Sequence, residues 1–457
     1  MLEHDIKSFH RAVPVFVLRE GAGTGVNPQV LLATTCRWFQ TARLAMALAD
    51  AGCEVSAVCP PGHPFAHTGA VRRSYTYHGL APLSSFSQAL TGAKPDLIVA
   101  LDDLAVWHLH QLHAQALRRG SAGAGTCALI ERSLGAPESF PVVSARSACI
   151  RQAQAAGLRV PRTEAIAGAE ELRRWAAGAG FPAMLKADHS SGGDGVRMVR
   201  SMEEAERSLR ALAAPPLWAR AAKRALVDRD QTLVWPALRR QRAVVNAQAF
   251  VAGREATSTV FCWQGRVLAG LHFEVLHKAT AAGHATVLRW IDHAEMTAAA
   301  EVMARRLGLS GICGFDFMLE ADTGHAYLIE INPRATQVGH LALGAGRDLP
   351  AALYAAVSGK MVQAAPKVTE KDTIALFPQE WIRDSASPFL RSAYHDVPWQ
   401  APALVREGAR SRQKQSAWYS RPNRGPAASA ARSGKLVTLP GTTAAVGIAA
   451  DRESLPS

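Results

Sequence analysis

Apolar runs and amphipathic stretches alternate through the first third of the chain. The segments VLLATT (30–35), CEVSAVCP (53–60) and KPDLIVALDD (94–103) have the length and branched apolar content of buried strands. Between the first two, RWFQTARLAMALADAG (37–52) has apolar residues at helical spacing. Strands that alternate with helices predict a parallel sheet with helices on its faces. We therefore expect a doubly wound, Rossmann-like domain over residues 1–135.

Two later apolar strands carry polar side chains. GFDFML places Asp316 between two phenylalanines. AYLIEINPR brings Glu330 and Asn332 to one face, because side chains two positions apart on a strand point the same way. The ADTGH turn between them has a length that joins antiparallel neighbours. Since strands rarely bury such groups without a function, this hairpin is the first candidate site.

The oxygen atoms of this hairpin suit a hard cation. Mg²⁺ prefers carboxylate and amide oxygens and usually completes its shell with water and substrate phosphates, and Mn²⁺ is an alternative ion. No Cys or His pair stands here at zinc spacing. Arg334 follows Pro333 and is suited to clamp a phosphate or a carboxylate. The alternative is a hairpin whose charges form a surface ion-pair cluster.

A second signal lies upstream in FPAMLKADHSSGGDGVRMV (181–199). It predicts a strand with Lys186, a Ser/Gly loop and a second strand. Glycines allow backbone N–H groups to approach an anion, and serines add donors, so the loop suits a polyphosphate. The segment is not a Walker loop, because no GK[ST] follows. Taken alone, it is more often a simple hairpin turn.

Together these segments resemble the ATP-grasp superfamily over residues 146–348. The resemblance implies Asp316, Glu330 and Asn332 as magnesium ligands and Arg334 as the arginine of an NPR motif. It also places adenine and ribose at the linker VVNAQAFVAGREAT (244–257). The residues that it implies for ATP binding are Arg146, Lys186, Ser190, Ser191, Gly192, Gly193, Gly195, Gln248, Ala249, Val251 and Glu255.

The chain departs from the family pattern at three positions. Arg146 stands where the family usually has lysine, and Gln248 stands where many members have glutamate, although its carbonyl can still accept from adenine. Gly314 stands where some of these ligases have an arginine near the transferring phosphate. That role would then fall to Arg334, to Lys278 or to the metal. We accordingly expect Arg334, Lys186 and Lys278 to be the catalytic residues.

The expected fold class is α/β, with α+β character in the catalytic lobes. The resemblance implies a Rossmann-like pre-ATP-grasp domain at 1–135, followed by a two-lobed ATP-grasp catalytic domain at 136–365 with its small lobe at about 160–250. A packing segment at 366–407 and a basic, disordered tail at 408–457 complete the order. With 457 residues, 48% of them apolar, the chain is long enough for two to four domains.

The charge and the cysteine content of the chain bear on its partners and its cellular compartment. The formal net charge is +13, but much of it falls in the tail, and such tails are more often solvated than bound to nucleic acid. The chain has seven cysteines without C-x-x-C pairs, which favours reduced thiols in a cytoplasmic protein. No apolar run approaches 18 residues, so we expect no membrane span.

The resemblance implies an ATP- and Mg²⁺-dependent, ADP-forming ligase. Such an enzyme activates a carboxylate as an acyl phosphate and joins it to an amine, and here an amino acid or a small metabolite acid is expected. One alternative is carbamoyl-phosphate-synthase-like or carboxylate kinase activity. An alternative of another class is an ATP-binding regulatory protein without turnover. The expected partners are small-molecule substrates, and a homodimer is the default oligomer.

Overall fold

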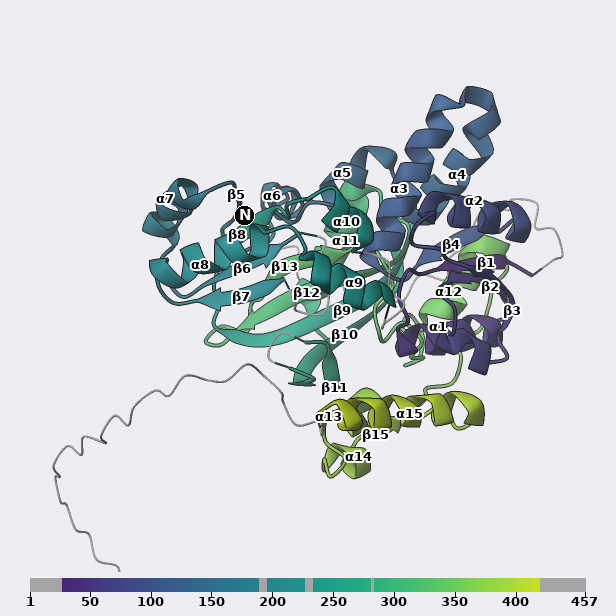
Figure 1. Cartoon of the computed structure of the whole chain (residues 1–457). Helices are drawn as coiled ribbons and strands as arrows, with labels where there is room; N and C mark the ends of the chain where they lie inside the picture. The colour runs from purple at the N-terminus through teal and green to yellow at the C-terminus, as the bar shows by residue number, and fades with distance from the viewer. Residues whose placement is uncertain (1–26, 189–194, 227–232, 281–282, 420–457) are drawn as a thin grey trace, which may run out of the picture. The chain divides into compact units, whose positions relative to one another are not determined.

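A computed structural model describes residues 27–188, 195–226, 233–280 and 283–419. Four parallel strands form the first sheet, in the order β3-β2-β1-β4 (Figure 1). They are β1 (Gln29–Ala33), β2 (Glu54–Cys59), β3 (Val71–Thr76) and β4 (Leu97–Ala100). The parallel sheet confirms the α/β prediction for this part of the chain. The helices of this region are α1 (Phe39–Asp50), α2 (Pro82–Ala93), α3 (Asp103–Arg118) and α4 (Ala124–Leu134).

The sequence of the central strands explains this arrangement. β1 is buried at four of its five residues and β4 along its whole length, as expected of strands with helices on both faces. Alternate residues of β1 enter different cores: Val30 and Leu32 pack in one, and Leu31 and Ala33 in another. The first of these cores also contains Phe261 and Leu271 of the largest sheet. The N-terminal sheet therefore shares a hydrophobic core with the region that carries the candidate site.

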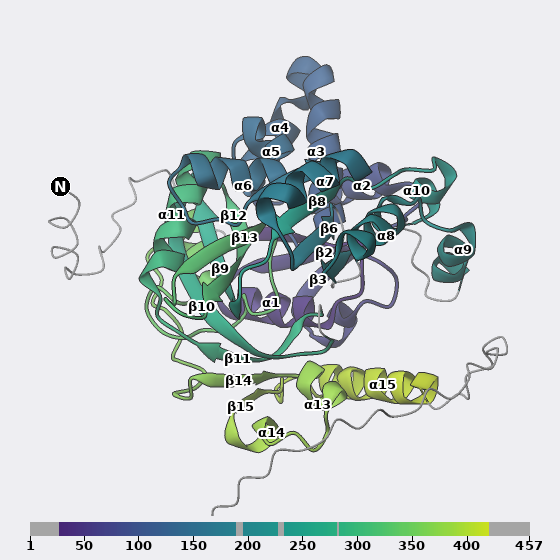
Figure 2. The same cartoon turned by 90° about the vertical axis from the view of Figure 1, so that its left-hand side faces the viewer.

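An antiparallel sheet of four strands, ordered β5-β8-β6-β7, forms the predicted small lobe. Helices α7 and α8 pack against this sheet, with Trp175 and Leu185 in the shared core (Figure 2). The four strands are β5 (Thr163–Ile166), β6 (Ala183–Ala187), β7 (Val196–Val199) and β8 (Val245–Ala249). The helices are α7 (Ala169–Ala179), α8 (Met202–Ala213), α9 (Trp218–Leu226) and α10 (Val234–Leu238).

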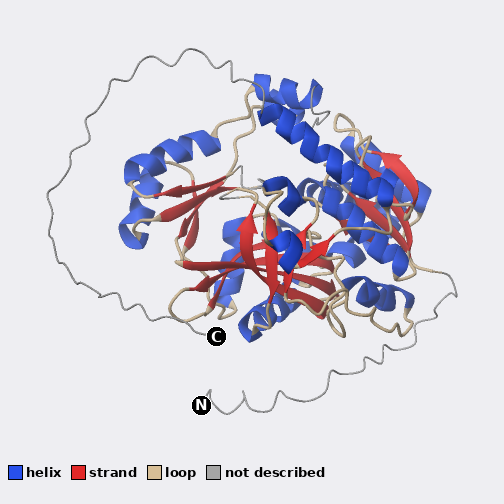
Figure 3. Ribbon diagram, turned by 90° about the horizontal axis from the view of Figure 1, so that it is seen from below, coloured by secondary structure: helices blue, strands red, loops and turns tan. Residues whose placement is uncertain are grey.

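The largest sheet has seven strands, ordered β13-β12-β9-β10-β11-β14-β15. Figure 3 draws the strands in red and the helices in blue. The strand pairs of this sheet are antiparallel except β14 with β15. The strands are β9 (Gly253–Trp263), β10 (Arg266–Lys278), β11 (Ala285–Trp290), β12 (Gly311–Glu320), β13 (Ala326–Asn332), β14 (Thr373–Leu376) and β15 (Tyr394–Asp396). Helix α11 (Ala294–Leu307) packs on it through Met296 and Met303. Since β14 and β15 complete this sheet, the predicted packing segment is part of its structure.

The remaining helices are α5 (Phe140–Val143), α6 (Arg146–Ala155), α12 (Leu349–Ser358), α13 (Gln379–Arg383), α14 (Phe389–Ser392) and α15 (Pro402–Tyr419). The predicted start of the disordered tail at residue 408 is wrong, because α15 continues to Tyr419. Gly408 lies against Phe377 and Phe39, so this turn is held by packing, and the following Ala, Arg, Gln and Lys residues favour a helix.

Residues 1–412 form one compact unit, and residues 413–457 are separated from it as a second. The finer domain boundaries at 135 and 365 stay predictions. Among the described helices, none is both long and apolar enough to cross a membrane.

Candidate active site

The predicted hairpin is present, and its register brings the polar groups together. β12 and β13 run antiparallel, with Asp316 opposite Glu330 and Gly314 opposite Asn332. β9 lies on the other side of β12 and places Thr257 opposite Asp316. Side chains two apart on a strand share a face, so these groups meet on one side of the sheet.

Hydrogen bonds hold the acid of the central strand from two sides. Asn332 Nδ2 donates to Asp316 Oδ2 at 2.8 Å, and Thr257 Oγ1 donates to Asp316 Oδ1 at 2.8 Å. Burial and the adjacent charge of Glu330 nevertheless raise the pKa of Asp316 to about 6. Burial also acts to raise the pKa of Glu330, but the cations Arg146 and Lys186 outweigh it and lower that pKa. Glu330 is therefore the more acidic of the two carboxyl groups.

Two cations of the predicted ATP site face Glu330. Arg146 is the first residue of α6, and its Nη2 donates to Glu330 Oε1 at 2.8 Å. Its other terminal nitrogen donates to the carbonyl of Ala187. Lys186 is buried on β6, where burial lowers its pKa while the charge of Glu330 opposes that shift. The structure thus brings Arg146, Lys186 and Glu330 together from three different elements.

Arg334 lies on the other side of the hairpin end. Its Nη2 donates to Asn332 Oδ1 at 3.1 Å, and its Nε forms an ion pair with Asp103 Oδ1 at 2.9 Å. Asp103 stands at the start of α3, directly after Asp102. Asp102 caps that helix by accepting from Ala105 N at 2.8 Å. The two adjacent acids therefore have different roles, because Asp102 caps the start of a helix and Asp103 pairs with Arg334.

Two further predicted residues pair with each other. Lys278 Nζ donates to Glu255 Oε1 at 2.5 Å, so the candidate ribose acceptor and the candidate phosphate cation are in contact. Glu255 and Thr257 share a face of β9, opposite Met318 and Asp316 of β12. The predicted ribose site is therefore on the same side of the sheet as the carboxylate cluster.

The predicted adenine site lies where β8 passes into β9 through residues 250–252. Gln248 is buried, and its Nε2 donates to Thr163 Oγ1 at 3.0 Å and to Ile329 O at 3.2 Å. Ala249 N donates to Arg162 O at 2.9 Å, so Ala249 would offer a ligand its carbonyl. Val251 follows in the connection and is half-buried.

The phosphate loop is described only in part. Ser190, Ser191, Gly192 and Gly193 lie outside the described residues. Gly195 closes the segment, and its carbonyl accepts from Ala187 N at 2.8 Å at the end of the β6–β7 pair. The predicted strands on both sides of the loop are confirmed.

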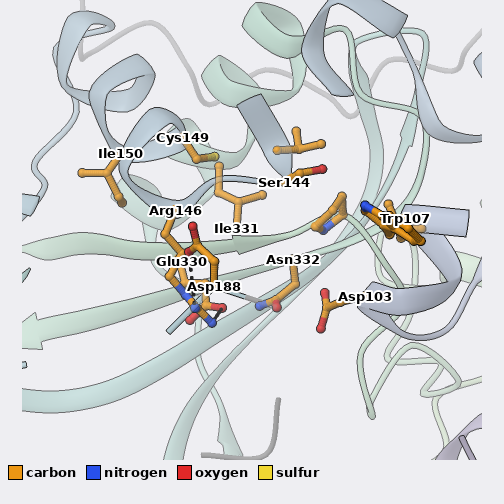
Figure 4. Close-up of a pocket in the computed structure, with 13 residues that line it drawn as sticks. Asp103, Trp107, Ser144, Arg146, Cys149, Ile150, Asp188, Glu330, Ile331 and Asn332 are labelled. Carbon is orange, nitrogen blue, oxygen red and sulfur yellow. Dashed lines mark hydrogen bonds and ion pairs between the residues drawn. The ribbon is translucent and has the colours of Figure 1, made fainter. Parts of the chain in front are cut away.

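A pocket opens beside these groups (Figure 4). Arg146, Asp188 and Glu330 gather at one end of it, Asn332 lies in the middle, and Asp103 and Trp107 lie at the other end. Apolar side chains from α3, α5 and α6 complete the wall, among them Val106, Val143 and Ile150. The cavity therefore joins an end with three charged groups to an end where an acid lies near a tryptophan.

Three pocket residues had little or no signal in the sequence. Asp188 comes two residues after Lys186, but nothing local marks it as a partner of Arg146. Asp103 directly follows another aspartate at the end of a strand-like run, and Trp107 stands in an ordinary helical pattern. Their roles depend on how distant segments meet.

The structure also explains the missing arginine at position 314. A Cβ on Gly314 would lie 2.3 Å from Thr336 Cγ2 and 3.4 Å from Asn332 Cβ. Any larger side chain would collide with the segment that follows Arg334. The position is thus filled by a neighbouring threonine.

The comparisons with known proteins agree with this geometry. The sequence family described as "Carbamoyl-phosphate synthase L chain, ATP binding domain" matches residues 145–345. These residues form an ATP-grasp domain. No curated protein matches the chain.

Solved structures share the ATP-grasp fold at low sequence identity. The biotin carboxylase domain of 2-oxoglutarate carboxylase from Hydrogenobacter thermophilus has a TM-score of 0.53 at 14% identity, over 74% of this chain and 71% of that one. Carboxyaminoimidazole ribonucleotide synthase from Aspergillus clavatus has 0.53 at 14%, over 74% and 78%. The L-amino acid ligase from Bacillus licheniformis has 0.50 at 15%, over 74% and 76%.

The donor set of the ATP-grasp domain fits a magnesium ion. Asp316 and Glu330 supply carboxylate oxygens and Asn332 an amide oxygen, all hard donors on one sheet face. Within the described part of the chain, no group of three or more His, Cys, Asp and Glu side chains could hold a metal ion. A cation at the hairpin would therefore rely on phosphate and water oxygens to complete its shell.

Proposed function

We propose that this protein is an ATP- and Mg²⁺-dependent, ADP-forming ligase that activates a carboxylate as an acyl phosphate and joins it to an amine. The supporting observation is that Arg146 and Lys186 face Glu330, whose strand shares a sheet face with Asp316 and carries Asn332, beside a pocket lined by Arg146, Glu330 and Asn332. Oxygen donors and two cations in one place suit a metal-bound polyphosphate. The structures that share its fold include an amino acid ligase.

Each residue then has a defined task. Asp316, Glu330 and Asn332 would hold Mg²⁺, which neutralises phosphate charge when bound. Arg146 and Lys186 face the phosphates, and Arg334 orients the carboxylate. A carboxylate oxygen attacks the γ-phosphorus and ADP leaves, after which the amine nitrogen attacks the acyl carbon and phosphate leaves. The enzyme contributes chiefly positioning and charge neutralisation, which in general can supply about 7 to 11 kcal/mol.

The pocket suggests the kind of acid to test. Val106, Trp107 and Val143 give the pocket an apolar wall, and Trp107 lies at the end away from Arg146 and Glu330. A substrate whose carboxylate lies near Arg334 would place an aliphatic or aromatic group against this wall. Acids with such side chains, including apolar amino acids, therefore belong first in a substrate panel.

A second activity is favoured by the family match. The matching family is that of a carbamoyl-phosphate synthase domain, and the Hydrogenobacter thermophilus domain was solved with bicarbonate. We therefore include bicarbonate as an acceptor, which would indicate carbamoyl-phosphate-synthase-like or carboxylate kinase activity. A homodimer and a cytoplasmic location stay predictions.

The test is phosphate release from Mg–ATP by the purified protein with bicarbonate and a panel of carboxylic acids, each with and without amines. We expect release with one acid and a loss of about 10²- to 10³-fold in Glu330→Gln, because a carboxylate that would hold the charge-neutralising magnesium ion is removed. Asp348→Asn is the control, since this buried acid caps α12 by accepting from Ala351 N at 3.0 Å. Mg–ATP binding without release under any acid would support the regulatory alternative.

A further inference from the structure

Asp188 is a buried acid at the charged end of the pocket that the proposed reaction does not use directly. It stands just after β6, two residues beyond Lys186, and its side chain is 7% exposed. Its Oδ1 lies 3.7 Å from Nη1 of Arg146. A carboxylate buried here needs hydrogen-bond or charged partners, because burying a charge without a partner is costly.

A second buried residue fixes this carboxylate. Asn246 on β8 is fully buried, and its Nδ2 donates to Asp188 Oδ1 at 2.8 Å. The same nitrogen lies 3.4 Å from the carbonyl of Lys186. The backbone of Asp188 is held as well, because its N–H donates to Val244 O at 2.8 Å. The acid is therefore fixed by β8 and the residue before it, in both its main chain and its side chain.

Arg146 is held at both terminal nitrogens. Nη2 donates to Glu330 Oε1, while Nη1 donates to Ala187 O and lies beside Asp188. A guanidinium is a planar fork, so its orientation depends on acceptors at both tips. A lysine ammonium is a point charge and has no plane to fix.

We propose that Asp188 and Asn246 are positioning residues that hold the Arg146 fork for Mg–ATP, and that this carboxylate is required because position 146 is arginine. Without Asp188 the fork keeps only the neutral carbonyl of Ala187 on the Nη1 side, so the charge of Glu330 draws both nitrogens onto its carboxylate. Such a bidentate pair is strong and withdraws Glu330 from a metal ion. Asp188 thus keeps Glu330 available. The inference rests on the proposed function, since Arg146 and Glu330 are taken as the phosphate and metal residues.

The test is a double-mutant cycle read by calorimetric titration of Mg–ADP, which does not require turnover. We expect Asp188→Asn to weaken binding about tenfold, because a buried charged partner 3.7 Å from Arg146 Nη1 is replaced by a neutral one. Arg146→Lys alone should cost only about threefold, and Asp188→Asn added to Arg146→Lys should cost less than about twofold more. Asn246→Ser, which shortens the donor, should act in the same direction as Asp188→Asn.

The outcomes separate two claims. If the wild-type protein does not bind Mg–ADP at all, the proposed function fails. If it binds but Asp188→Asn weakens binding equally with and without the Arg146→Lys substitution, the proposed function stands and the positioning role is overturned. Circular dichroism and the thermal midpoint exclude unfolding, and Asp348→Asn serves as the matched substitution outside the pocket, where we expect unchanged affinity. Loss of binding in that control would also overturn the inference.

Discussion

Two clusters of buried charged residues differ in how their charges are paired. In the first, which we term the closed cluster, Asp396 on β15 forms an ion pair with Arg43 of α1 and is 2.7 Å from His340 Nε2. The side chains of Asp396, Arg43 and His340 are 1%, 9% and 3% exposed. Each oxygen of Asp396 has its own partner. This cluster joins three segments, and both oxygens of its one carboxylate are already paired within the protein.

The second, which we term the pocket cluster, consists of Arg146, Lys186, Asp188 and Glu330. Three of its members, Arg146, Asp188 and Glu330, line a cavity, and the side chain of Glu330 is 21% exposed. Its charges come from α6, from β6 and the residue directly after it, and from β13. Buried charge alone therefore does not mark a functional site. What distinguishes the pocket cluster is that its groups face a space in which a ligand can replace their present partners.

The largest expected effect breaks the closed cluster. Asp396→Asn leaves Arg43 buried without its carboxylate, which typically costs about 3–5 kcal/mol. We expect a clearly lower urea and thermal unfolding midpoint, while the protein that remains folded binds Mg–ADP as the wild type does. A folded variant with lost nucleotide affinity would show that the closed cluster belongs to the site.

A smaller effect is expected at the edge of the pocket cluster. Gly314→Ala places a methyl group against Thr336 and should cost about 1–3 kcal/mol by overpacking. Thr336→Ser removes the colliding methyl, so the double variant should recover most of the stability. Chemical denaturation measures the free energy of unfolding of both variants. An equal loss in the single and double variants would contradict the proposed collision.

The smallest effects are those of pH, and they differ between the clusters. Burial acts to raise the pKa of Asp396, but His340 and Arg43 outweigh it and hold that pKa low. Burial lowers the pKa of His340 from 6.5, although Asp396 opposes this. Both folded pKa values lie below the unfolded ones, so the stabilisation is complete above 6.5 and declines on acidification, first through His340 and then through Asp396.

At Asp316, which lies opposite Glu330 of the pocket cluster, the same acidification should weaken nucleotide binding. Because the pKa of Asp316 is about 6, this carboxyl takes up a proton below that pH and becomes a poorer magnesium ligand. We expect Mg–ADP affinity to fall by up to about tenfold per pH unit below 6. Calorimetric titration of Mg–ADP between pH 7 and 5 measures this affinity. Asp316→Asn should bind weakly at every pH and lose this dependence, and a retained dependence would assign the proton to another group.

Local patterns in the sequence predicted the pieces of the site that lie on single strands. The hairpin with Asp316 and Glu330 and the strand with Lys186 follow from residue spacing, and both are in the structure. Arg146 came only from the family resemblance, because a basic residue at a helix start carries no local signal. The sequence also predicted the parallel N-terminal sheet from its apolar runs, and the resemblance implied the small lobe.

Contacts between distant segments could not be predicted in this way. Asp188 and Arg146 are on different elements, and Arg43 and Asp396 are separated by 353 positions. Position 408 was misjudged because the composition of the tail hides the packing of Gly408 on Phe377. In each case the deciding interaction is tertiary, so single-sequence patterns do not contain it.

The most direct measurement of the central claim is a calorimetric titration of Mg–ADP into the wild-type protein, Glu330→Gln and Asp396→Asn under identical conditions. If the pocket cluster is the nucleotide site and the closed cluster is structural, Glu330→Gln will lose most of the affinity without a comparable loss of stability. Asp396→Asn will lose stability and keep the affinity. Unchanged affinity in Glu330→Gln would contradict the assignment of the pocket as the site of ATP-dependent chemistry.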